Sequence, residues 1–227
     1  MASRGAAVAL IARRAPKLRE VAARCGARAL PIVADMTHRS DVRRAVREAI
    51  EHFGRIDVWV NNVGRGITRN PSELTDEDVN EMMRINVFTA LYGMQEVLPH
   101  FKERGAGQIV NVSSMLGRIP FAVYRAAYSA CKHYLNALTA NLRDELSGTH
   151  PGIVVTLVSP GTVRTEFGKN ALHGGPESHT LPYSQSAEEV AAVIADAIES
   201  GKQDVYTRKG FAERVAKYFA DIGEDPP

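Results

Sequence analysis

The stretch Gln108-Ile-Val-Asn-Val-Ser-Ser114 is followed, fourteen residues after Ser114, by Tyr128-Ser-Ala-Cys-Lys132. The first is rich in β-branched residues and predicts a strand over 108–113. The second opens a segment with an apolar stripe at helical spacing, which predicts a helix over 127–146. A tyrosine and a lysine four residues apart share one helical face. On this helix both residues border the apolar stripe. The ammonium of the lysine, placed beside the phenol, would make ionisation of the phenol easier.

The same alternation of short apolar runs and amphipathic segments continues on both sides of this unit. Further strands are predicted at 6–12, 29–34, 56–61, 153–158 and 204–207, and a helical segment follows each of them. The run at 6–12 is continuously apolar, which favours a strand buried on both faces. Strands that alternate with helices predict an α/β fold, a doubly wound parallel sheet of Rossmann-like type in a three-layer α/β/α arrangement.

Length and composition bound the class of protein. With 227 residues and 44% hydrophobic content, we expect a single domain over residues 1–227. The formal charge of +2 comes without a basic run interleaved with aromatic residues, so no nucleic-acid partner is expected. The longest apolar runs are far shorter than the roughly 20 residues that span a bilayer. We therefore expect no membrane span and a cytoplasmic location.

Metal and disulfide chemistry have no support in the sequence. The two cysteines, Cys25 and Cys131, lack CxxC spacing, and the seven histidines lack ligand-like order. We expect reduced cysteines and no metal site. In an open parallel sheet, ligands bind at the carboxyl ends of the strands. Residues 164–186 are rich in glycine and proline and predict a long loop that binds substrate.

Five motifs, in order along the chain, resemble the short-chain dehydrogenase/reductase family from residue 5 to about residue 206. They are Asn61-Asn-Val-Gly64, Asn86 within Arg-Ile-Asn-Val, Ser114 within Ser-Ser, Tyr128xxxLys132 and Pro160-Gly-Thr-Val-Arg-Thr165. The resemblance implies an NAD(P)-dependent oxidoreductase that transfers hydride between nicotinamide and a small-molecule ketone or secondary alcohol. It also implies a homodimer or homotetramer.

The resemblance further implies catalytic roles for four residues. Tyr128 would exchange a proton with the substrate oxygen, and Ser114 would hydrogen-bond that oxygen, with Ser113 as the alternative serine. Lys132 would lower the pKa of the tyrosine and hold the nicotinamide ribose. Asn86 would keep a water molecule in the proton relay, or would only satisfy buried backbone groups.

The cofactor-binding set implied by the resemblance extends along the strand ends. Besides Tyr128 and Lys132 it contains Arg13, Asp35, Met36, Asn62, Val63, Gly64, Pro160, Gly161, Val163 and Thr165. An acidic residue at the end of the second family strand would bind a ribose hydroxyl, whereas an arginine suits a 2′-phosphate. Arg13 and Arg14 stand at that point, so NADP is favoured over NAD.

The start of the chain departs from the family pattern. Family members begin with a strand and a glycine-rich turn that approaches the pyrophosphate, and neither precedes residue 6 here. Because the first strand is central in a doubly wound sheet, we expect a gap between 6–12 and 58–61. The chain would then fold poorly or close the gap by direct pairing.

Two explanations for this beginning remain open. Met1 is an internal residue of a longer protein, or the short form is real and is a non-catalytic scaffold related to the family. The intact downstream motifs favour the first explanation and the oxidoreductase function. The non-catalytic scaffold is the alternative function.

Overall fold

The computed structural model describes residues 1–223 and confirms a parallel α/β fold of Rossmann-like type. Its strands are β1 (Val8–Ala12), β2 (Ala29–Val33), β3 (Val58–Asn61), β4 (Gly107–Val112), β5 (Ile153–Ser159) and β6 (Asp204–Tyr206). The helices are α1 (Ala15–Cys25), α2 (Arg39–Phe53), α3 (Asp76–Met83), α4 (Thr89–Arg104), α5 (Ala126–Ser147), α6 (Ala187–Ser200) and α7 (Phe211–Ala220). All strand pairs are parallel.

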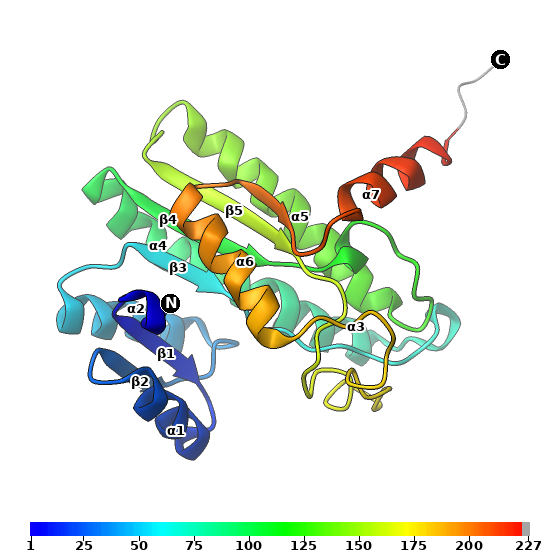
Figure 1. The fold of residues 1–227 in the computed structure, drawn as a ribbon, viewed down its shortest axis with the longest axis horizontal. Coiled ribbons are helices and arrows are strands. Elements are labelled where there is room, and N and C mark those ends of the chain that lie inside the picture. The colour runs from blue at the N-terminus through cyan, green and yellow to red at the C-terminus, as the bar shows by residue number, and fades with distance from the viewer. Residues whose placement is uncertain (224–227) are drawn as a thin grey trace.

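The helices lie on both faces of the strands, as the alternation predicts. Figure 1 shows α6 in front of the larger sheet, with α4 and α5 behind it. The helix α7 projects from the body of the molecule at the end of the described chain, and none of its residues is buried. In this three-layer arrangement the helices cover the faces of the sheet, and the carboxyl ends of β4 and β5 are bordered by the loops that follow these strands.

The strands form two sheets, and this division corresponds to the expected gap. The first sheet has the order β1-β2 and the second the order β3-β4-β5-β6. Within residues 1–223, β1 pairs only with β2 and β3 only with β4, so the direct pairing considered above is wrong. No residue of β1 is buried, which also corrects the prediction of a strand buried on both faces. β1 has a neighbouring strand on one edge only, so it is less well covered than a central strand of a sheet.

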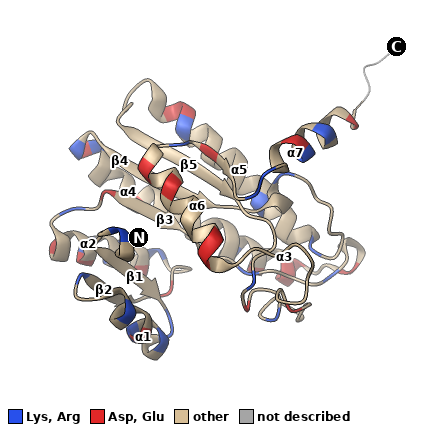
Figure 2. Ribbon diagram, viewed as in Figure 1, with Lys and Arg blue, Asp and Glu red and all other residues tan. Residues whose placement is uncertain are grey.

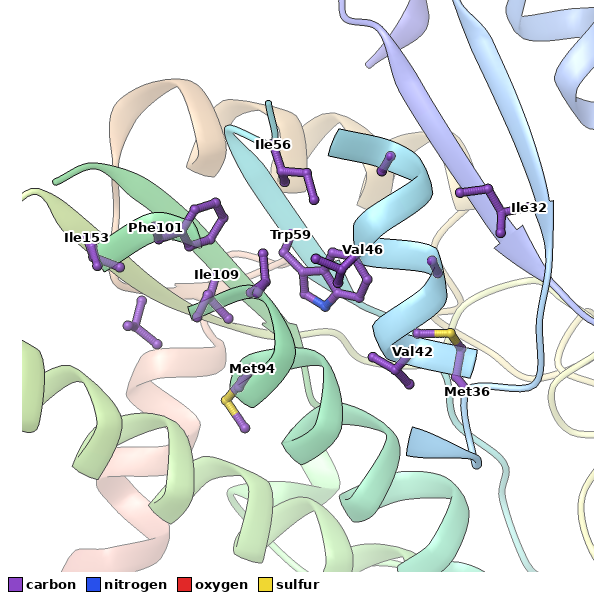
Figure 3. Packing of buried hydrophobic residues seen from close by; sticks show 14 of the residues in the cluster. Ile32, Met36, Val42, Val46, Ile56, Trp59, Met94, Phe101, Ile109 and Ile153 are labelled. Atoms are coloured by element: carbon purple, nitrogen blue, oxygen red, sulfur yellow. The ribbon is translucent and has the colours of Figure 1, made fainter. Parts of the chain in front are cut away.

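One apolar core joins the two sheets. Figure 3 shows Val42 and Val46 of α2 near Trp59 of β3, with Ile109 and Phe101 beside them. Ile32 of β2 belongs to the same buried cluster, so α2 connects the smaller sheet to the larger one through side-chain packing. Burial of such side chains contributes roughly 1.5–3 kcal/mol each.

A second buried cluster lies near the carboxyl ends of the strands, where the candidate site is found. It consists of Ile67, Met82, Val87, Ala127, Tyr128 and Cys131. A π-helical turn (Arg84–Phe88) lies between α3 and α4. π-Helical turns often accompany functional sites, and this one carries Asn86.

Charged side chains are distributed over the outer surface. In the view of Figure 2, charges of both signs occur over the surface, although α6 carries acidic residues only. This mixture is compatible with the absence of a basic run in the sequence. Within residues 1–223, no helix is both long and apolar enough to span a membrane.

Candidate active site

A cavity of about 450 Å³ opens at the carboxyl ends of β4 and β5. Its walls come from the start of α5, the segment after β5, the loop over 164–186 and one side of α6. The sequence-predicted residues that line it are Asn62, Gly64, Ser114, Tyr128, Lys132, Pro160, Gly161, Val163 and Thr165. Most of the predicted set is therefore brought together around one cavity.

A tight turn after β4 holds Ser114 beside α5. Ser114 caps a 3₁₀ turn (Met115–Gly117), and its Oγ accepts a hydrogen bond from the Leu116 amide at 3.1 Å. Gly117 packs directly on α5, where a Cβ would lie 2.9 Å from backbone atoms of Lys132. Such a distance is too short for a methyl group, so only glycine allows the turn to approach the helix this closely.

The two adjacent serines have different surroundings. Ser113 is buried and donates a hydrogen bond to Oδ1 of Asn136, whose Nδ2 donates to the Gly117 carbonyl at 2.6 Å. Ser114 instead lines the cavity beside Tyr128, where its hydroxyl lowers the pKa of the phenol. Both serines line the cavity, and the Ser113 hydroxyl is already engaged in holding the turn to α5.

Tyr128 is 7% exposed and packs edge-on against Phe167, with ring centroids 5.5 Å apart. Burial raises the pKa of its phenol to about 12, while the Ser114 hydrogen bond and the charge of Arg125 lower it in part. Desolvation therefore outweighs the polar and charged groups near the phenol. The role of Lys132 in lowering the phenol pKa stays a prediction.

The ammonium group of Lys132 lies under the cavity. The residue is 3% exposed, and Nζ donates to the Val112 carbonyl at 2.9 Å. Nζ stands 5.7 Å from the centroid of the Tyr128 ring. Burial lowers the pKa of this lysine to about 8. The remaining N–H donors of Nζ are free to bind a ligand in the cavity.

Asn86 is buried and binds protein backbone. Its Nδ2 donates to the carbonyls of Arg65 and Met82, at 3.0 and 3.1 Å, and its Oδ1 accepts from the Arg65 amide at 3.0 Å. These contacts fasten the loop after β3 to the π-helical turn. They match the second reading of this residue, in which it satisfies buried backbone groups.

Four residues of the predicted cofactor-binding set lie outside the cavity, namely Arg13, Asp35, Met36 and Val63. Arg13 is exposed, and its Nη1 stands 3.6 Å from Oδ2 of Asp35. Met36 is buried in the larger core, as Figure 3 shows, and Val63 is exposed. Asp35 accepts hydrogen bonds from the amide and hydroxyl of Thr37, at 3.0 and 2.8 Å. The arginine and the carboxylate are thus brought together at the ends of β1 and β2.

The segment after β5 is fixed by backbone hydrogen bonds. The Pro160 carbonyl accepts from the Met115 amide at 2.7 Å, which ties this segment to the turn at Ser114. The Thr162 carbonyl accepts from the Gln185 amide at 2.9 Å, and the Gln185 carbonyl accepts from the Arg164 amide at 2.8 Å. The two ends of the 164–186 loop are therefore held together next to the cavity.

Several residues of the cavity wall were not predicted from the sequence. Arg125 lies three residues before Tyr128 and is buried, and Phe167 covers the phenol. Val190 and Ile194 reach the cavity from α6. An arginine at the start of an otherwise apolar helical face was the available signal for Arg125. The α6 residues have the same periodicity as any core-facing helix, so nothing in the sequence separates them from ordinary packing.

The chain matches the family model for short chain dehydrogenase over residues 1–174. It is 29% identical over 198 residues to an uncharacterised oxidoreductase of Staphylococcus epidermidis, covering 87% of this chain and 80% of that protein. A short chain dehydrogenase from Burkholderia cenocepacia, solved in complex with NADP, is 28% identical with a TM-score of 0.80, over 96% of this chain and 84% of that one.

A further solved structure is the 3-ketoacyl-(acyl-carrier-protein) reductase from Brucella melitensis, complexed with NADH. It is 25% identical, with a TM-score of 0.75, and the match covers 90% of this chain and 86% of that one. The fold, the cavity and these matches together define the class of protein. The chain belongs to the short-chain dehydrogenase family of oxidoreductases.

The cavity has the chemistry that the nicotinamide end of such a cofactor requires. Lys132 presents unused N–H donors, and the Tyr128 phenol lies on the same wall. Gly64 closes the space from the side of β3, where a Cβ would stand 3.7 Å from Nζ of Lys132 and 3.1 Å from Oδ1 of Asn86. Such a Cβ would be in ordinary contact with the ammonium but unusually close to the Asn86 side chain, so the glycine avoids crowding Asn86.

Proposed function

We propose that this protein is a nicotinamide-dependent oxidoreductase that interconverts a ketone and a secondary alcohol, with Tyr128 as the acid and base. The observation that carries the proposal is the meeting of Tyr128, Ser114 and Lys132 on one cavity wall. A phenol beside a hydroxyl can receive a carbonyl oxygen between two donors. A buried phenol with a pKa near 12 holds its proton at neutral pH, which suits donation to a reduced substrate.

In this proposal the bound nicotinamide supplies or accepts the hydride. Ser114 orients the substrate oxygen, and Tyr128 transfers a proton between its phenol oxygen and that oxygen. Lys132 binds the ribose hydroxyls through the N–H groups that Val112 does not use. Its charge, 5.7 Å from the centroid of the Tyr128 ring, would favour the ionised form of the tyrosine. The Val163 backbone and Thr165 would hold the carboxamide, and Pro160 and Gly161 belong to the same cofactor-binding segment.

We favour NADP as the cofactor because of Arg13 and Arg14. Arg13 is exposed at the end of β1, where a guanidinium can pair with a 2′-phosphate. Asp35 competes for the same guanidinium at 3.6 Å, so the phosphate would have to displace or share this contact. The ribose 2′-hydroxyl of NAD carries no charge, so its interaction with Arg13 would be weaker than that of the 2′-phosphate of NADP.

The proposal also includes a cytoplasmic homodimer or homotetramer, which follows from the family resemblance. A non-catalytic scaffold is not favoured, because the three polar groups that the reaction needs converge on the same cavity.

Cofactor fluorescence tests the proposal directly. Titration of the purified chain with NADPH and NADH should give saturable binding, about tenfold tighter for NADPH, the discrimination that roughly 1.4 kcal/mol provides. Arg13→Gln should remove most of this preference while leaving NADH binding unchanged. Arg28 precedes β2 and so lies at the opposite end of the parallel strand pair from Arg13. Arg28→Gln is therefore the matched control and should keep the preference for NADPH. Absence of binding at millimolar cofactor would contradict the enzymatic function.

A further inference from the structure

The charges around the cavity are unbalanced. Among the residues that line it, Arg125 and Lys132 are the two that carry a formal charge, and both are cationic. No aspartate or glutamate lines the cavity within residues 1–223. Much of the remaining wall is apolar and includes Phe121, Phe167 and Leu181. In surroundings of low polarity such an excess of positive charge attracts an anionic ligand.

Lys132 already has a place in the proposed reaction, whereas Arg125 does not. Arg125 is 7% exposed, and its Nη1 donates to the Ile67 carbonyl at 2.9 Å. Burial lowers the pKa of its guanidinium, and the groups that oppose this shift are Tyr124 and Tyr128. No carboxylate takes part. A buried cation without an anionic partner is costly, and proteins normally supply a partner or use the charge.

Arg125 has a structural role as well. Its guanidinium lies close to Gly66 and Gly175, where an added Cβ would come within 2.5 Å of Nη1 and 2.9 Å of Nη2. The arginine therefore helps to hold the loop after β3 next to the 164–186 loop. A neutral donor could form the hydrogen bond to Ile67, so this role does not by itself require a charge.

The position of Arg125 relates it to the reacting group. It immediately precedes α5 and stands three residues before Tyr128, close enough for its charge to lower the pKa of the phenol. An anion held by this guanidinium would lie in the same cavity as the phenol. A planar carboxylate is the anion that a guanidinium binds best through two parallel N–H bonds.

We propose that the substrate is an oxo acid or hydroxy acid and that Arg125 binds its carboxylate. This inference rests on the proposed oxidoreductase function, because it assigns the substrate class of the same site. The carbonyl or alcohol carbon is presented to Tyr128 and Ser114, while Arg125 fixes the opposite end of the molecule. Apolar residues of the wall cover the carbon skeleton between the two ends.

Binding can be measured without turnover. Calorimetry of the cofactor-loaded protein would compare cyclohexanecarboxylate with cyclohexanecarboxamide, a neutral ligand of similar shape. The carboxylate should bind at least about tenfold more tightly to the wild-type protein, as expected for a charged hydrogen-bonded pair. Arg125→Met should abolish this preference, and Arg125→Lys should restore part of it. Equal binding of the two ligands to the wild-type protein would overturn the inference.

Arg65→Met is the matched control. Its Nε donates to the Asn170 carbonyl at 2.9 Å, so this arginine also fastens the 164–186 loop, but it does not line the cavity. The variant should retain the preference for the carboxylate. If Arg65→Met loses it as fully as Arg125→Met, loop order rather than charge is responsible and the inference fails. The wild-type comparison remains decisive if Arg125→Met does not fold.

Turnover then separates the two proposals. Reduction by NADPH of 4-oxocyclohexane-1-carboxylate should exceed that of its carboxamide at least about tenfold in kcat/KM. Equal turnover of both ketones would keep the oxidoreductase and refute the anionic substrate. Preferential binding of the carboxylate ligand without turnover of either ketone would support the role of Arg125 and contradict the proposed reaction.

Discussion

At the scale of single residues, the site depends on two buried groups whose pKa values move in opposite senses. Burial raises the pKa of Tyr128 to about 12 and lowers that of Lys132 to about 8. Both shifts favour the neutral forms, since desolvation penalises charge. At neutral pH the protein thus holds a protonated phenol beside a buried ammonium whose desolvation costs free energy. Cofactor and substrate would supply the polar partners that these groups lack.

Replacement of Lys132 by methionine should stabilise the protein while abolishing turnover. At pH 7 the folded protein must bury an ammonium, so Lys132→Met is expected to raise the free energy of unfolding by about 2 kcal/mol. Folded Lys132 loses its proton near pH 8, whereas an unfolded lysine keeps it to about pH 10.4. Wild-type stability therefore rises between these values, and the advantage of the variant should fade. Urea denaturation at pH 7 to 10 measures this.

The exposed Lys169 provides the control for that experiment, since Lys169→Met should change stability by less than about 0.5 kcal/mol. A Lys132→Met protein that is less stable than the wild type at pH 7 would contradict the assignment of a costly buried charge.

At the scale of elements, the 164–186 loop is joined to the start of α3 by a carboxylate. Asp78 is buried and contacts Nη1 of Arg69 at 2.9 Å and Nε2 of His173 at 2.7 Å. The hydrogen bond with His173 lowers the pKa of Asp78 despite the opposing effect of burial. His173 has a φ of 63°, a left-handed conformation that is unfavourable for most side chains. The contact with Asp78 helps to hold the loop in this form.

Loss of this carboxylate should loosen the loop. Asp78→Asn is expected to accelerate tryptic cleavage after Lys169 about tenfold, because a charged hydrogen-bonded contact no longer opposes local opening. The pKa of Asp78 is lower in the folded protein than in the unfolded chain, where it is near 3.9. The stability that the Asp78 carboxylate contributes is therefore fully present above the unfolded pKa and is lost as pH falls through the folded pKa. Asp76→Asn, in the same first turn of α3, should leave the cleavage rate unchanged. Equal rates in wild type and Asp78→Asn would show that this contact does not order the loop.

The sequence predicts the elements well and the electrostatics poorly. Apolar periodicity locates the strands and α5, and the motif spacing brings Ser114, Tyr128 and Lys132 to one cavity. The direction of the Tyr128 pKa shift could not be predicted, because the burial comes from Phe167 and other distant segments. Arg125 was missed for the same reason. Its lack of a carboxylate partner becomes visible only when the loops around it are in place.

At the scale of the whole molecule, the division into two sheets leaves two strand edges without a partner in the described chain. The Val8 amide and the Ala12 carbonyl both bond to residues next to β2. In a parallel strand, alternate residues direct their amides to opposite sides, so Ala9 and Ile11 point toward the other edge. The core that joins the sheets consists of side chains, while the backbone between β1 and β3 is not bridged.

Hydrogen exchange should therefore distinguish alternate residues of β1. The amides of Ala9 and Ile11 are expected to exchange at least about a hundredfold faster than that of Leu10, since open backbone groups lack protection. Amides of β4, paired on both sides, provide the protected reference. Slow exchange at all three β1 positions would mean that this edge is paired in solution, contrary to the two-sheet arrangement.

The proposal that Tyr128 transfers the proton is tested most directly by the turnover and cofactor affinity of Tyr128→Phe. The variant keeps the ring that packs on Phe167 and removes only the hydroxyl. We predict that kcat falls at least about a thousandfold, within the range that general acid catalysis contributes. The NADPH dissociation constant should stay within about threefold of the wild-type value, about 0.65 kcal/mol. A Tyr128→Phe protein that binds NADPH normally and retains most of its turnover would contradict the proposed function of this site.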